Sequence, residues 1–129
     1  MNYLSIDYGT VHIGLAIASS PIAEPYDQLK NDQHLISNLK RIIDQENIDM
    51  IIIGVSEGQM LGLTQQFIHL LKKHFSQPII EYDETLSSSL ASKYLVSSGA
   101  KKKKRQTQDH QIAAAIILQN YLDENPSGV

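Results

Sequence analysis

The sequence predicts an α/β domain, in which a mixed sheet of about five strands is covered by helices on both faces. Two alternating apolar segments, residues 4–8 and 12–18, are separated by Gly9-Thr10, which indicates antiparallel strands joined by a tight turn. Further apolar runs at residues 50–53 and 78–82 are each followed by a segment of helical periodicity, a pattern typical of parallel strands linked by helices. A length of 129 residues predicts one domain.

The first half of the chain also predicts a third strand and a first helix. Residues 23–29 form the strand, and Pro25 favours an edge position because proline cannot donate to a sheet ladder. Asn31 or Asp32 can cap a helix that ends near residue 47. Its expected buried stripe is Ile36, Leu39, Ile42 and Ile43.

The second half predicts three more helices. The run at residues 50–53 is apolar on both faces, as in a central strand, and ends in a loop with three glycines at 54–62. The second helix is expected to bury Leu63, Phe67, Leu70 and Leu71. A third helix begins near Thr85 or Ser87 and stops at Gly99. The last helix spans about 108–123, with the apolar face Ile112, Ala113, Ile116, Ile117 and Tyr121.

Composition excludes several classes of protein. No apolar run approaches the roughly 20 residues that span a membrane, so no membrane partner is expected. The N-terminus leads directly into a strand without the pattern of a signal peptide. The absence of cysteine excludes disulfides and thiolate metal sites, and it fits a cytoplasmic protein.

Positive charge is concentrated in one segment, which consists of Lys101, Lys102, Lys103, Lys104 and Arg105. The other six basic residues stand against fourteen acids, which leaves a formal charge of −8 on the rest of the chain. A polyanion should therefore be repelled everywhere except near this basic segment. The segment predicts nucleic-acid binding, and a solvated loop is the plainer alternative.

Acidic residues follow or end several of the predicted elements. Asp7 ends the first strand, Asp83-Glu84 ends the strand at 78–82, and Asp109 is expected in the first turn of the last helix. Ligands on such sheets collect at the carboxyl ends of the strands, so these acids should converge on one edge. Each has a structural alternative, because Asp7 can form a turn and the others can cap helices.

Converging carboxylates repel one another unless hard cations neutralise them, and Mg²⁺ or Mn²⁺ prefers oxygen ligands. Two such ions can activate a water and stabilise the leaving oxygen in phosphodiester cleavage. The acids and the basic segment together therefore favour a metal-dependent nuclease. His12 and His110 neighbour the proposed site residues, where contact with substrate is a further hypothesis.

Motifs along nearly the whole chain resemble the YqgF family of ribonuclease H-like proteins. They are residues 7–10 (Asp-Tyr-Gly-Thr) with Ile13-Gly14, residues 83–87 (Asp-Glu-Thr-Leu-Ser), and Asp109 leading into residues 113–118. Members are described as Holliday junction resolvases and as pre-16S rRNA nucleases. The resemblance implies a single ribonuclease H-like nuclease domain over residues 1–129. It also implies that Asp7, Glu84 and Asp109 are the catalytic and metal-binding acids, with Mg²⁺ or Mn²⁺ as the ion.

The chain departs from the usual family pattern at several positions. Val11-His12 replaces a basic pair, and Thr85 replaces the arginine after the Asp-Glu pair. The loop motifs Gly-Leu-Pro and Asn-Met-Asp-Gly are replaced at residues 54–56 and 59–62. These changes remove positive charge and a polar loop side chain, and they retain all three acids.

Two other functions remain open from the sequence. A ribonuclease H-like module that binds nucleic acid without cutting it would fit the missing basic residues. The Asp-Gly-Thr type of turn also resembles the phosphate loop of actin-like ATPases, although those need a second lobe. The sequence does not decide between an RNA precursor and branched DNA as substrate, or between a monomer and a homodimer.

Overall fold

The computed structural model describes residues 1–55, 59–83 and 102–125, and it describes residues 59–60 and 102–109 by their backbone alone. Five strands form one sheet in the order β3-β2-β1-β4-β5, with β1 (Tyr3–Asp7) at its centre. The other strands are β2 (His12–Ala18), β3 (Glu24–Lys30), β4 (Met50–Val55) and β5 (Ile79–Asp83). The helices are α1 (Leu35–Gln45), α2 (Gln59–His74) and α4 (Lys102–Glu124).

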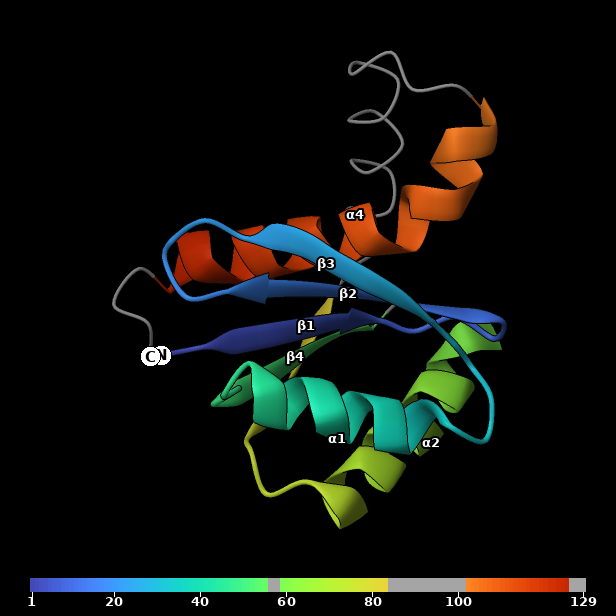
Figure 1. Ribbon diagram of the computed structural model, residues 1–129, viewed down its shortest axis with the longest axis horizontal. Helices are drawn as coiled ribbons and strands as arrows, with labels where there is room; N and C mark the ends of the chain where they lie inside the picture. The colour runs from blue at the N-terminus through green and yellow to red at the C-terminus, as the bar shows by residue number, and fades with distance from the viewer. Residues whose placement is uncertain (56–58, 84–101, 126–129) are drawn as a thin grey trace.

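The sheet is mixed, as expected. β1 pairs antiparallel with β2 and parallel with β4, while β4 pairs parallel with β5. Pro25 lies in β3, which is an edge strand, because a missing N–H is tolerated there. Figure 1 shows α4 on one face of the sheet and α1 with α2 on the other, so the expected cover on both faces is confirmed.

The two faces of the sheet follow the alternation of the strands. Leu4 and Ile6 of β1 belong to the same buried cluster as Leu39 of α1 and Leu71 of α2. Tyr3 belongs to the cluster that contains Ala114 and Ile117 of α4. Ser5 and Asp7 share this second face with Tyr3, because side chains along a strand alternate.

The inward stripe of α2 differs from the prediction. Thr64, Phe67, Ile68 and Leu71 are buried, whereas Leu63 and Leu70 are 41% and 40% exposed. The helix also begins at Gln59, so residues 59–62 are helical and not part of a glycine-rich loop. The buried set still follows helical spacing, but the stripe is rotated relative to the predicted one.

The last helix begins earlier than the sequence suggested. α4 starts at Lys102, so residues 102–105 are helical and the expectation of a basic loop was wrong. Asp109 is then the eighth residue of α4 and not a member of its first turn as expected, so the helix N-terminus does not stabilise its charge. The predicted third helix, near residues 85–98, lies outside the described residues. None of the helices in the described part of the chain is both long and apolar enough to cross a membrane.

Candidate active site

Asp7 is the polar centre of the candidate site. It ends the central strand β1, with β2 on one side and β4 on the other, and it is 7% exposed. Its side chain lies on the face of the sheet that α4 covers. Burying a carboxylate is costly unless it is hydrogen-bonded or bound to a cation, so its partners define the chemistry of this site.

The nearest described partner of Asp7 is His110 of α4. The Nδ1 atom of His110 lies 2.8 Å from Oδ2 of Asp7. An ionised carboxylate has no hydrogen to offer, so the ring N–H donates this hydrogen bond. The bond connects residues 103 positions apart and brings a ring nitrogen to the buried acid.

Glycine makes this approach of α4 possible. Gly14 pairs with Asp7 across β1 and β2, and a Cβ at Gly14 would overlap the backbone carbonyl of His110. A Cβ at Gly9 would lie 3.0 Å from the Cε1 atom of His110 and would also collide with the backbone oxygen of His12. These two glycines therefore leave the space in which the His110 backbone and ring sit beside Asp7.

A buried hydrogen bond holds the same helix on the sheet one turn further on. The hydroxyl of Ser5 donates to the backbone carbonyl of Ala114, with 2.6 Å between the oxygens. Both residues are fully buried. Since Ser5 and Asp7 point to the same face of β1, this bond sets the position of α4 close to the acid.

The turn that follows Asp7 is held from the other side by Asn31. The amide nitrogen of its side chain donates to the carbonyl of Gly9 at 2.9 Å and to the hydroxyl of Tyr8 at 3.2 Å. The ring of Tyr8 packs against Phe67 of α2, with 4.6 Å between the ring centroids. Residues 8 and 9 are therefore fixed next to the acid.

The other predicted site residues are placed less completely. Glu84 and Lys101 lie outside the described residues, and Asp109 and residues 102–105 are described by backbone alone. Asp83 ends β5 opposite Val55, which packs in the cluster on the α1 and α2 face. Asp83 therefore points to the face of the sheet opposite Asp7.

The sequence placed His110 beside the proposed site as a hypothetical contact for substrate, and it did not predict the hydrogen bond to Asp7. Helical spacing puts position 110 on the line of Ala114, Ile117 and Tyr121, which pack on the sheet. Position 109 falls on the neighbouring line of Ile112, Ala113 and Ile116, a separate cluster. The signal was available in the sequence, but a carboxylate in the expected motif outweighed it.

Two of the described side chains, Asp7 and His110, could serve as ligands of a divalent ion. A buried carboxylate oxygen and a ring nitrogen face one another, and oxygen and imidazole nitrogen are both common metal ligands. Among the described side chains, no group of three or more histidine, cysteine or acidic residues comes together. Further ligands would therefore have to come from residues whose side chains are not described, or from water and substrate.

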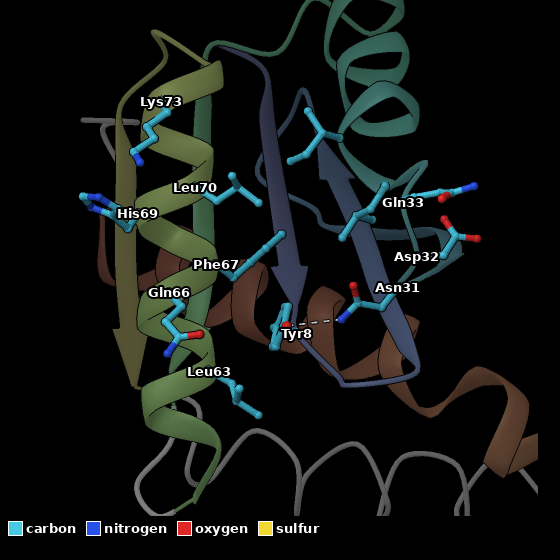
Figure 2. A pocket seen from close by; sticks show the side chains of 12 residues that line it. Tyr8, Asn31, Asp32, Gln33, Leu63, Gln66, Phe67, His69, Leu70 and Lys73 are labelled. Atoms are coloured by element: carbon cyan, nitrogen blue, oxygen red, sulfur yellow. Dashed lines mark hydrogen bonds between the residues drawn. The ribbon is translucent and has the colours of Figure 1, made fainter.

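A cleft of about 540 Å³ lies on the α1 and α2 face of the sheet, and Tyr8, the residue after Asp7, is part of its lining (Figure 2). Leu63, Phe67 and Leu70 of α2 supply apolar lining, while Asn31, Gln66 and Lys73 supply polar groups. Since Asp7 points to the other face of the sheet, this cleft is separate from the carboxylate site.

Comparison with known proteins gives one consistent family. The family model for RuvX, described as Holliday junction resolvase, matches residues 1–124. Proteins of a Geobacillus species and of Chlorobaculum tepidum are 31% and 34% identical, each over 95% of this chain and over 98% and 93% of their own lengths. A protein of Mycoplasmopsis synoviae is 35% identical over 95% of this chain and 98% of its own. Each of the three is named a candidate pre-16S rRNA nuclease.

Two solved structures share the architecture. T. thermophilus RuvC in complex with Holliday junction substrate matches with a TM-score of 0.68 at 13% identity, over 99% of this chain and 96% of that one. Fowlpox virus resolvase with substrate Holliday junction DNA matches with a TM-score of 0.66 at 15% identity, over 97% and 99%. At these identities the likeness shows the fold, and the expected ribonuclease H-like class is confirmed.

Proposed function

Because this chain belongs to the RuvX family of Holliday junction resolvases, also called YqgF, we propose that it is a metal-dependent nuclease. It would hydrolyse phosphodiester bonds in nucleic acid. The observation that carries the proposal is the buried carboxylate of Asp7, which ends the central strand and faces a nitrogen of α4 at 2.8 Å. An acid in this position is stable only with a compensating cation or hydrogen bond.

Asp7, Glu84 and Asp109 are the proposed catalytic acids and would hold Mg²⁺ or Mn²⁺. When bound, such ions supply an activated water and stabilise the leaving oxygen. Asp7 fits this role because its carboxylate is buried and stands at the edge where ligands collect. Asp109 is adjacent in sequence to His110, whose side chain reaches Asp7.

The faces of the sheet support Glu84 over Asp83 as the second acid. Ile80 and Tyr82 of β5 pack on the α4 side, and Ile79 and Asp83 belong to the other side. Asp83 therefore points away from Asp7. The choice of Glu84 as the second acid therefore rests on the family motif and on the orientation of Asp83.

The basic segment, Lys101 to Arg105, is the proposed contact for the phosphate backbone. Residues 102–105 open α4, where the helix dipole disfavours cations by about 0.3–1 kcal/mol each. A bound polyanion would compensate this cost. Position 105 lies five residues before His110, or about 7.5 Å along the helix axis, so a phosphate backbone bound by the segment would lie close to the site.

Binding to duplex RNA or DNA at several salt concentrations tests the basic segment. If about three of its side chains contact phosphates, they contribute about −2.7 to the slope of log K against log salt. We expect replacement of Lys102, Lys103 and Lys104 by alanine to weaken binding across unrelated sequences and to flatten the slope. An unchanged slope would mean that the segment is solvated and does not bind nucleic acid.

The favoured substrate is the 5′ end of a precursor of 16S ribosomal RNA, since the relatives named above carry that activity in their names. Branched DNA is the alternative substrate, because the family is described as Holliday junction resolvase. The purified protein with Mn²⁺ or Mg²⁺ should be tested on an RNA precursor and a synthetic four-way junction side by side. We expect cleavage of the RNA in this assay. In the cell the protein would act in the cytoplasm, as a monomer or a homodimer.

The variant Asp7→Asn keeps the shape of the side chain and removes a charged ligand. It should lose metal-dependent cleavage while it remains folded. Full cleavage activity in Asp7→Asn would reject the metal-site hypothesis. Binding of nucleic acid by the wild-type protein without any cleavage would favour an inactive binding module instead.

A further inference from the structure

We propose that His110 is a direct ligand of the divalent ion, with its Nδ1 atom and Oδ2 of Asp7 sharing one ion. This inference rests on the proposed function and revises its ligand set, because it names His110 in place of Asp109 as the residue of α4 that reaches the metal. The ion would bind beside this pair, and the Nδ1 proton would leave to solvent so that the ring nitrogen can donate its lone pair. The site would then contain an oxygen ligand from β1 and a nitrogen ligand from α4.

The distance between the two atoms supports this assignment. Two neighbouring ligands of an octahedral ion, each at about 2.1 Å and at a right angle, lie about 3 Å apart. Oδ2 and Nδ1 are 2.8 Å apart in the hydrogen bond. The separation therefore suits a pair of metal ligands, and conversion would also require a turn of the imidazole ring that points the Nδ1 lone pair at the ion.

The protein also holds the two ligands in place before the ion binds. Asp7 ends the central strand and pairs with Gly14 of β2. The backbone of His110 rests against Gly14. The Ser5 hydroxyl fixes α4 one turn away through the Ala114 carbonyl. Ligands on rigid elements need little rearrangement, which is the condition for a defined metal site.

The alternative ligand from α4 is Asp109, which the family resemblance favours. The two positions differ by about 100° around the helix. Position 110 shares the line of residues that pack on the sheet, and position 109 shares the line of Ile112 and Ile116. The helix therefore presents position 110 to Asp7 more directly.

A nitrogen ligand changes the choice of metal. Imidazole is typical of transition-metal sites, whereas Mg²⁺ is held mainly by carboxylate, carbonyl and water oxygens. We therefore expect the chain to bind Mn²⁺ more tightly than Mg²⁺. The variant His110→Asp, which restores an all-oxygen set, should shift the ratio of the two dissociation constants toward Mg²⁺.

The test is pulsed electron paramagnetic resonance of the full chain loaded with Mn²⁺, which detects a directly bound ¹⁴N nucleus. We expect nitrogen coupling in the wild-type protein and in the control His12→Gln, because His12 is exposed at the start of β2. The coupling should be absent in His110→Asp. A titration that follows free Mn²⁺ should show affinity weakened about tenfold or more in His110→Ala.

Three results would overturn the assignment. The first is the absence of nitrogen coupling in wild-type protein that binds Mn²⁺, and the second is nitrogen coupling that persists in His110→Asp. The third is unchanged Mn²⁺ affinity in His110→Ala together with loss of Mn²⁺ binding in Asp109→Asn. If a variant does not fold, absence of nitrogen coupling in the wild-type spectrum still overturns the assignment. Cleavage by a wild-type protein that lacks nitrogen coupling would reject His110 as ligand and leave the nuclease intact. Absence of both cleavage and Mn²⁺ binding would reject the proposed function itself.

Discussion

The two faces of the sheet are packed in different ways. Toward α1 and α2, the central strands present large aliphatic side chains, among them Leu4, Ile6 and Leu15, all fully buried. Toward α4 they present Ser5, Gly14 and Ala16. The α4 face is therefore covered by a helix whose backbone comes very close to the strands.

The two faces therefore contribute differently, one mainly to the stability of the fold and the other to the candidate site. A thick aliphatic layer removes a large apolar area from water and contributes most of the folding free energy. The thin α4 face contributes less per residue, but its small side chains let a helix bring a nitrogen to a buried acid. Substitutions on the aliphatic face should therefore change stability first, and substitutions on the α4 face should change the site.

The largest loss of stability is expected from Leu15→Ala, on the aliphatic face. Deleting a fully buried leucine side chain and leaving a cavity should lower the free energy of unfolding by about 2–5 kcal/mol. Denaturant unfolding measures the change. Leu70→Ala is the matched control, because Leu70 is 40% exposed, and it should cost about 1 kcal/mol or less. Equal losses in the two variants would contradict the described packing.

Gly14→Ala should affect both stability and the site. The added Cβ would overlap the His110 carbonyl, so α4 must move away from Asp7, at a cost of about 1–3 kcal/mol. Mn²⁺ affinity should fall with it, as measured by titration. The control is Gly62→Ala in α2, where nothing lies near the added atom, and helix propensity should raise stability by about 0.5–1 kcal/mol. Tolerance of Gly14→Ala with unchanged metal affinity would refute the close approach.

A smaller effect is expected from Ser5→Ala, which removes the hydrogen bond to the Ala114 carbonyl. The loss should be about 0.5–1.5 kcal/mol by thermal or denaturant unfolding. Ser37→Ala is the control, since the Ser37 hydroxyl donates to the His34 carbonyl on the exposed side of α1. That variant should stay within about 0.5 kcal/mol of the wild type. A larger loss at Ser37 than at Ser5 would argue against the buried bond as an anchor of α4.

The smallest effect concerns Tyr82, whose hydroxyl donates to the Glu124 carboxylate at 2.8 Å and connects β5 to the end of α4. Partial burial, together with this hydrogen bond and the charge of Glu124, raises the pKa of Tyr82 to about 12. The folded protein therefore holds the phenolic proton more tightly than the unfolded chain, whose pKa is about 10. The stabilisation is fully present below pH 10 and is lost as the pH rises toward 12.

Tyr82→Phe should remove this dependence. Below pH 10 the wild type should be more stable than the variant by less than about 1 kcal/mol, because the bond is exposed to solvent. Unfolding curves measured between pH 8 and 11 compare the two proteins. A gap that widens with rising pH would show that the sign of the pKa shift is wrong.

The sequence by itself determined the class of fold and the place of the central acid. Alternation along residues 4–8 and 12–18 is a local property of extended chain, so it predicted β1, β2 and their antiparallel pairing. The continuous apolar run of β4 likewise predicted a covered, central position. Asp7 followed from the end of the first strand, and the motifs around it identified the family.

The tertiary structure decided which side of each helix faces inward and where α4 begins. The leucines of α2 lie on more than one side of the helix, so the sequence alone does not fix its buried face. Packing on the sheet buries Thr64 and Phe67, whereas Leu63 is exposed. Helical periodicity fixes the spacing of such a stripe, but the neighbouring element fixes its direction. The partner of Asp7 was decided in the same way, because only the approach of α4 over Gly14 puts His110 beside the carboxylate. Helical spacing placed position 110 on the side of α4 that faces the sheet, but its hydrogen bond to a residue 103 positions away is a product of the packing.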